Sequence, residues 1–194
     1  MSGSAPLVVV SAGTYHLPFD RLGEWIGRWH ARNRDVRIVF QHGPSRPVPG
    51  AENFGILAYE DLLDLCRRAD AVVLQGGAGG VMDMRSLGIV PIVVPRVPGA
   101  GEVVDDHQLV FSEEMAKLGL LHRATTYEEL TAALSAALSG ATLTAARKVS
   151  THAMDHIRAQ LSTPPRPVPW TTRSARLMSA TAGEVRRRLT RSGR

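Results

Sequence analysis

Four glycines in residues 76–80, interrupted only by Ala78, are the strongest chemical signal in the sequence. They follow an apolar run at residues 71–74 and precede a stretch that we expect to become helical near Val81. Glycines at a strand-to-helix junction let the backbone approach a ligand and aim several N–H groups, with the helix dipole, at an anion. The segment therefore suits a phosphate or diphosphate, although a tight turn also uses such glycines. It is neither a Walker loop, since no Gly-Lys-Ser/Thr follows, nor a dinucleotide fingerprint, which belongs on the first strand.

Asp83 stands about one turn into the helix expected after the glycines. A carboxylate there can accept hydrogen bonds from both hydroxyls of a ribose whose phosphates lie on the glycine loop. The alternative is an acidic residue in the first helical turn that the helix dipole stabilises and that binds nothing. Together, the glycines and Asp83 indicate a nucleotide ligand.

A second polar group, Asp-Asp-His-Gln at residues 105–108, follows the last apolar run. Carboxylate, imidazole and amide groups at the start of an expected helix supply convergent donors and acceptors, which suits a polyhydroxylated sugar. Helix capping by Asp105 or Asp106 explains one residue but not the set. His107 can also serve as a general base or a metal ligand. Because no second histidine lies nearby at ligand spacing, we expect no metal site.

The apolar pattern predicts the scaffold that positions these residues. Runs rich in β-branched residues occur at residues 7–10, 36–40, 71–74 and 89–94. Between them, apolar residues recur at helical spacing: Phe19, Leu22, Ile26 and Trp29; Leu62, Leu65 and Cys66; Leu109, Met115 and Leu118; and Leu130, Leu134 and Leu138. This alternation predicts an α/β domain with a Rossmann-like open parallel sheet and helices on both faces. Ligands bind such sheets beyond the carboxyl ends of the strands, where the glycine loop and residues 11–15 lie.

The composition is that of a globular protein of one or two domains, with 44% hydrophobic and 21% charged residues in a chain of 194. The single cysteine, Cys66, cannot form an internal disulfide, which fits a reducing compartment and excludes a cysteine-built zinc site. No apolar run approaches the roughly 20 residues that cross a bilayer, and no signal peptide is recognisable. We therefore expect a cytoplasmic protein.

The positive charge of the chain is concentrated at its C-terminal end. Residues 164–194 hold eight arginines and one glutamate, so they carry +7, and residues 1–163 carry −2. We expect a nucleotide-sugar-binding domain at residues 1–140, a helix at 141–163, and a proline-rich linker with a helical basic tail at 164–194. The tail suits an anionic lipid surface, the alternatives being a partner protein or a disordered, solubilising end. Because its basic residues lie outside the sheet and lack interleaved aromatics, we expect no nucleic-acid binding.

Together the motifs resemble the C-terminal, donor-binding half of family 28 glycosyltransferases, over residues 7–138. The resemblance rests on Gly-Thr after the first strand, Phe-Asp-Arg-Leu at residues 19–22, Ala-Asp at residues 69–70, the glycine loop with its later acid, and Asp-Asp-His-Gln. It implies one half of a GT-B fold. In architecture the chain is similar to the small subunits of two-part enzymes: the eukaryotic dolichol-linked N-acetylglucosaminyltransferase and bacterial transferases of capsule and exopolysaccharide synthesis.

The resemblance also implies site residues. Those implied for the donor nucleotide are Gly13, Thr14, Leu57, Tyr59, Gly77, Ala78, Gly79, Gly80 and Asp83, and those for the donor sugar are Asp106, His107 and Gln108. Among them, Leu57 and Tyr59 match the uracil site and Asp83 matches a ribose-binding glutamate. The implied reaction inverts the anomeric centre and needs no tightly bound metal and no cofactor.

Two residues depart from the family pattern. Gln75 stands where a histidine usually precedes the glycine loop, and Gly80 where a serine or threonine usually binds the diphosphate. Each change removes a side-chain phosphate contact of about 1–2 kcal/mol. The departures favour, as an alternative, a non-catalytic activating subunit of such a transferase. A Rossmann-like nucleotide hydrolase is a second alternative, although its Pro-Gly-Gly entry and paired glutamates are missing.

A transferase of this architecture has two lobes, with the reaction in the cleft between them. About 130 residues match the donor lobe, and the first strand begins near residue 7, so we expect the acceptor lobe on a separate, membrane-anchored subunit. That subunit is also expected to supply the general base, with His107 as the candidate on this chain. The expected substrates are a UDP-sugar and a saccharide acceptor linked to a polyprenyl diphosphate, at the inner face of the cell membrane. In isolation the chain is expected to be able to self-associate through the surface meant for its partner.

Overall fold

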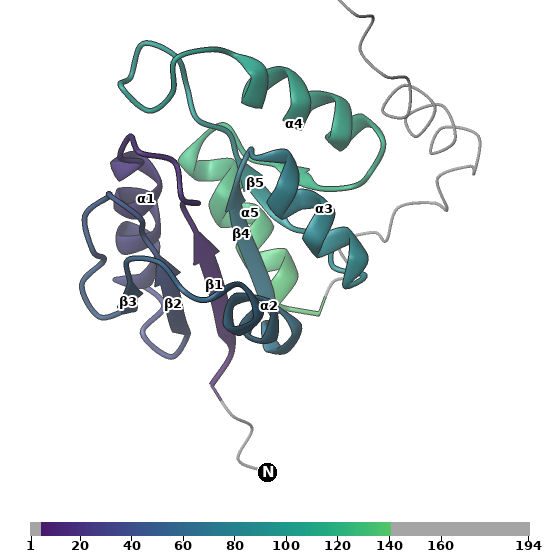
Figure 1. Ribbon diagram of the computed structural model, residues 1–194. Coiled ribbons are helices and arrows are strands. Elements are labelled where there is room, and N and C mark those ends of the chain that lie inside the picture. The colour runs from purple at the N-terminus through teal and green to yellow at the C-terminus, as the bar shows by residue number, and fades with distance from the viewer. Residues whose placement is uncertain (1–4, 141–194) are drawn as a thin grey trace, which may run out of the picture. The chain divides into compact units, whose positions relative to one another are not determined.

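The apolar runs form one open sheet in which all strands are parallel (Figure 1). The computed structural model describes residues 5–140. Within them the strands are β1 Leu7–Ser11, β2 Arg37–Gln41, β3 Glu52–Phe54, β4 Ala71–Gln75, β5 Ile92–Val94 and β6 His122–Arg123. Their order across the sheet is β3-β2-β1-β4-β5-β6. The connections therefore run in opposite directions from β1 and from β4, and the loops after these two strands meet where such sheets bind ligands.

Helices connect the strands and cover both faces of the sheet (Figure 1). They are α1 Asp20–His30, α2 Tyr59–Arg68, α3 Ala78–Ser86, α4 His107–Lys117 and α5 Tyr127–Leu138. Alternate residues of a strand point to opposite faces. Val8 and Val10 therefore pack with α1 and α5, whereas Val9 packs in the cluster that holds α2, α3 and part of α4. Burial on both faces explains why the strands are unbroken apolar runs.

The predicted α/β fold with an open parallel sheet is confirmed, and the structure adds two strands that the sequence did not reveal. The two added strands, β3 and β6, are short and mainly polar and lie at the edges of the sheet, so neither contains an apolar run. The strand expected at residues 89–94 begins only at Ile92. Ile89 instead lies in the turn that caps the end of α3, since its N–H donates to the Met84 carbonyl.

Two helices bury partly different residues from those expected. Cys66 is buried in α2 as expected, but the other buried residue is Leu63, with Leu62 and Leu65 only partly buried. Leu118 follows the last residue of α4 and is 39% exposed, so it does not belong to the core.

Gly140, two residues after the last residue of α5, adopts a φ of +68° and stops the helix from continuing. The helix expected at residues 141–163 and the linker and basic tail expected at 164–194 lie outside the described residues. Between residues 5 and 140, none of the helices combines the length and the apolar character that crossing a membrane requires.

We expect the thiol of Cys66 to be unreactive in the folded protein. Its side chain is 1% exposed in the α2 face of the core, and burial, with a smaller effect of the Asp83 carboxylate, raises its pKa to about 11. At mildly alkaline pH only about one thiol in a thousand is then ionised. Labelling with a disulfide reagent should be at least about 100-fold slower in buffer than in concentrated guanidinium chloride. Equal rates would show that this helix opens freely.

Candidate functional site

The loops after β1, β2 and β4 approach one another closely through glycine. Gly13 adopts a φ of +76°, and a Cβ at this position would overlap the side-chain amide of Gln75 at the end of β4. Gly43, after β2, has a φ of +60°, and a Cβ there would lie 2.8 Å from the Gly13 carbonyl oxygen. Both positions therefore require glycine, which brings the backbone of the predicted Gly13-Thr14 loop beside the glycine loop. Thr14 is exposed there.

The glycine loop passes directly into α3, whose first residue is Ala78 rather than a residue near Val81. Gly77 is the N-cap, with extended backbone and no capping side chain, and Gly79 and Gly80 lie in the first turn. A Cβ on Gly79 would meet nothing within 4 Å. Within residues 5–140, the start of α3 thus has no side-chain cap, and there is open space beside Gly79, which is an arrangement that can bind an anion at a helix N-terminus.

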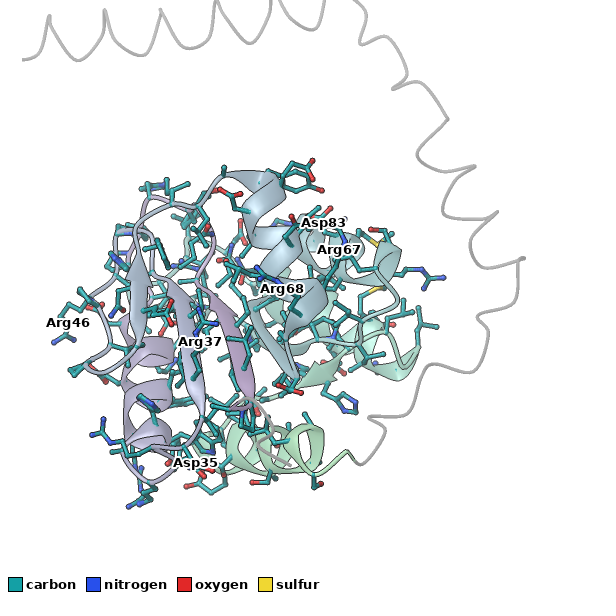
Figure 2. All side chains as sticks on the ribbon, turned by 90° about the horizontal axis from the view of Figure 1, so that it is seen from below. Asp35, Arg37, Arg46, Arg67, Arg68 and Asp83 are labelled. Atoms are coloured by element: carbon teal, nitrogen blue, oxygen red, sulfur yellow. The ribbon has the colours of Figure 1, made fainter. Side chains whose placement is uncertain are left out.

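Tyr59 and Asp83 meet across the gap between α2 and α3. The Tyr59 hydroxyl donates to Asp83 Oδ1 at 2.9 Å, and this hydrogen bond raises the pKa of Tyr59. Because α3 begins at Ala78, Asp83 lies in its second turn, and the alternative of a first-turn acid is wrong. The residues expected at the base and at the ribose therefore form one exposed pair. Figure 2 shows Asp83 and Arg67 of α2 on the same side of the domain.

Leu57, also expected at the base, contacts mainly the rest of the domain. Its N–H donates to Gln41 Oε1 at 3.0 Å, and its side chain packs against the core cluster that contains α2 and α3. Gln41 in turn donates from Nε2 to Ser11 Oγ at 3.0 Å. A chain of hydrogen bonds therefore fixes the segment before α2 to the ends of β1 and β2.

The predicted sugar-binding segment forms the start of α4. Asp106 is the N-cap residue, but its side chain makes no capping hydrogen bond. Asp105 Oδ1 accepts from the backbone N–H of His107 at 3.1 Å and lies 3.0 Å from its Nδ1. The imidazole is 87% exposed, so it faces solvent beside the glycine loop rather than the core.

Gln108 connects the start of α4 to the ends of β4 and β5. Its Oε1 accepts hydrogen bonds from the backbone N–H of Gly76 at 3.1 Å and from that of Arg96 at 3.2 Å. A backbone N–H can only donate, so the Gln108 oxygen must face these groups and its NH₂ must face away from them. The structure thus places the predicted sugar-binding residue next to the predicted phosphate loop.

We expect the imidazole of His107 to titrate above the ordinary value for histidine. The hydrogen bond that the imidazole donates to the Asp105 carboxylate is the largest cause that raises its pKa, and the charge of the same carboxylate adds to it. A group with a raised folded-state pKa stabilises the fold below about pH 6.5, and this contribution is lost as pH rises through the folded-state pKa. An NMR titration should show the raised pKa, and Asp105→Asn should return it toward 6.5. An unchanged pKa of His107 in that variant would show that the Asp105 carboxylate does not pair with the imidazole.

Arg96, which the sequence analysis missed, is fully buried beneath these loops. Its guanidinium donates to Gln75 Oε1 at 2.6 Å, to the Ala12 carbonyl at 2.9 Å and to the Glu102 carbonyl at 2.8 Å. It also donates to the carbonyls of Leu17 and Pro18. One side chain therefore holds the loops after β1, β4 and β5 together. The available signal was a charged residue between two prolines, directly after a buried strand.

Glu102 and Arg21 complete this buried cluster. The Glu102 carboxylate is 6% exposed and accepts from Arg21 Nε at 2.8 Å and from Arg21 Nη2 at 2.9 Å. It also accepts from the Val97 N–H at 2.8 Å. With Arg96, the cluster contains two guanidinium groups and one carboxylate, so it carries a net positive charge under the loops. Among residues 5–140, no three histidine, cysteine or acidic side chains gather as metal ligands would.

Three comparisons connect this geometry to known proteins. Residues 27–161 match the family described as "Glycosyltransferase family 28 C-terminal domain". The chain is 30% identical over 125 residues to UDP-N-acetylglucosamine--N-acetylmuramyl-(pentapeptide) pyrophosphoryl-undecaprenol N-acetylglucosamine transferase of Saccharopolyspora erythraea. That similarity covers 59% of this chain and 32% of the relative, so the chain spans about a third of the relative's length.

Solved structures share the fold. The glycotransferase of kitacinnamycin has a TM-score of 0.55 at 22% identity, over 74% of this chain and 37% of that one. A calicheamicin glycosyltransferase has a TM-score of 0.54 at 18% identity, over 83% and 45%. MurG of Acinetobacter baumannii has a TM-score of 0.50 at 19% identity, over 71% and 42%.

Proposed function

The chain belongs to the family of glycosyltransferase family 28 C-terminal domains, and on this premise we propose that it is the donor-binding lobe of an inverting transferase that uses a UDP-sugar. The observation that carries the proposal is the close approach of the loops after β1, β2 and β4 at the carboxyl end of the sheet. The uncapped start of α3, the Tyr59 and Asp83 pair and the amide of Gln108 belong to the segments that follow these strands or contact them there. These groups match, in order, the diphosphate, the nucleoside and the sugar of the donor.

Each group has one chemical task in the proposed complex. The N–H groups of Ala78, Gly79 and Gly80, with those of the Gly13-Thr14 loop, bind the diphosphate, whose charge grows as it leaves. Asp83 accepts from the ribose hydroxyls, and Tyr59 and the backbone near Leu57 border the uracil. Asp106, His107 and Gln108 bind the sugar hydroxyls. An acceptor hydroxyl attacks the anomeric carbon as the bond to the UDP oxygen breaks, and its proton passes to a general base.

We propose a saccharide linked to a polyprenyl diphosphate as the acceptor, in capsule or exopolysaccharide synthesis. The support is the relative from Saccharopolyspora erythraea, whose name describes transfer to a pyrophosphoryl-undecaprenol substrate. A lipid-linked acceptor requires work at a membrane surface, so we place the protein at the inner face of the cell membrane. A separate, membrane-anchored subunit supplies the acceptor lobe and the general base, and without it the chain can self-associate through the surface meant for that subunit.

Calorimetric titration of the full chain with UDP, GDP, dTDP and their sugars tests the donor assignment. We expect the uracil nucleotides to bind most tightly. Binding of none of them would overturn the assignment of a donor lobe. Transfer by the chain together with the product of a neighbouring gene tests the two-subunit arrangement, which efficient transfer by this chain alone would exclude.

The alternative of a non-catalytic activating subunit is separated from the enzyme by His107→Ala and Gln108→Ala in the reconstituted pair. If the chain binds the reacting donor, each change should lower transfer at least about tenfold while the two subunits still co-purify. Unchanged transfer in both variants would favour the activating subunit. The family match gives no support to the nucleotide hydrolase.

A further inference from the structure

Gln75 ends β4 at the point where the Gly13 loop and the glycine loop face each other. Its amide contacts both: a Cβ on Gly13 would overlap it, and a Cβ on Gly77 would lie 3.4 Å from Nε2. These are the two loops to which the proposed function assigns the diphosphate. The side chain thus stands between the groups expected to bind the same anion.

The orientation of this amide is dictated by Arg96. The Nε of Arg96 lies 2.6 Å from Gln75 Oε1. A guanidinium has only donors, so the amide atom that faces it must be the oxygen, and the NH₂ must point away, toward the two loops. No acceptor in residues 5–140 takes a hydrogen bond from Nε2, and Nε2 is not among the buried polar atoms without a partner. It is a donor still accessible to a ligand.

Arg96 itself cannot easily turn away from this contact. It is fully buried, and its other N–H groups are held by carbonyls from the loops after β1 and β5. The rings of Phe19 and Tyr15 lie 4.7 Å and 5.5 Å from its guanidinium carbon. Its charge, only partly offset by the Glu102 carboxylate that Arg21 shares, adds an attractive potential for an anion above Gln75.

We propose that Gln75 donates from Nε2 to the diphosphate of the bound nucleotide and that Arg96 is the positioning residue that keeps this donor turned toward it. The inference rests on the proposed function and deepens it. Under this proposal, Gln75 supplies a phosphate donor where the family usually has histidine, in contrast to the expectation that it removes a phosphate contact.

Gln75→Glu is the sharpest test, because it is isosteric and keeps the oxygen that accepts from Arg96 while replacing the NH₂ with a second, negatively charged oxygen. NMR titrations of the full chain with UDP and with uridine separate the diphosphate from the nucleoside. We expect the Kd for UDP to rise at least about tenfold while the Kd for uridine stays within about twofold. Asp83→Asn is the matched comparison, since it should raise the Kd for UDP and the Kd for uridine by the same factor.

Arg96→Lys tests the positioning role, since it keeps the charge and loses the fork that holds the Gln75 oxygen. This variant should raise the Kd for UDP more than the Kd for uridine. In the Gln75→Glu background it should cause no additional loss of UDP affinity. If Gln75→Glu changes the Kd for UDP and the Kd for uridine by the same factor, or changes neither, the inference is overturned. A wild-type chain that does not bind UDP would instead overturn the proposed function, and this inference with it.

Discussion

Arg96→Met is expected to lower the free energy of unfolding by about 3–5 kcal/mol, the range for removing one partner from a buried charged network. The substitution fills much of the same volume but leaves the carbonyls of Ala12 and Glu102 and the Gln75 oxygen without their donor. Each buried acceptor left unpaired costs about 1–3 kcal/mol. In a chain of this size the midpoint of thermal unfolding should fall by roughly 10 °C or more, measured by circular dichroism.

Arg46→Met is the matched control for this prediction. The Arg46 side chain is 72% exposed, although it pairs with Asp20 at 3.1 Å and with Glu24 at 2.8 Å. Figure 2 shows it projecting from the edge of the domain. Exposed pairs of this kind contribute about 0–1 kcal/mol, so the variant should unfold close to the wild type. If the two variants unfold at the same temperature, Arg96 does not hold the three loops together.

Asp83→Asn is expected to raise the Kd for UDP by about 10- to 100-fold. The proposed role of the carboxylate is to accept from two ribose hydroxyls, and hydrogen bonds to a charged group contribute about 1.5–3 kcal/mol, whereas an amide offers one acceptor and no charge. The substitution preserves shape, and an amide oxygen can still accept from the Tyr59 hydroxyl. Isothermal titration with UDP measures the change.

Asp35→Asn controls for the loss of one negative charge. Asp35 is exposed in the loop before β2, and Figure 2 shows it at the opposite end of the domain from Asp83. It should leave the Kd for UDP unchanged. If the Asp83→Asn variant binds UDP as tightly as the Asp35→Asn variant does, Asp83 does not bind the ribose.

The sequence predicted the parts of the fold that depend on neighbouring residues. The apolar runs of β1, β2 and β4 and the spacing of Phe19, Leu22, Ile26 and Trp29 around α1 are local patterns, and all were found where expected. The start of α3 was misplaced for a physical reason. Glycine weakens a helix locally, but here Val81 and Met84 pack into the core and extend the helix back through Gly79 and Gly80.

By itself, the sequence determined a parallel α/β sheet, a glycine loop fit for an anion and polar groups at the carboxyl ends of the strands, because residue spacing and the missing Cβ of glycine act over a few residues. Only the tertiary structure decided that Tyr59 bonds Asp83, 24 residues away, and that Arg96 reaches Ala12, 84 residues away. Those contacts follow from the order of the strands across the sheet, which no local pattern encodes. The same long-range packing fixes the orientation of the Gln75 amide, because the Arg96 guanidinium faces its oxygen.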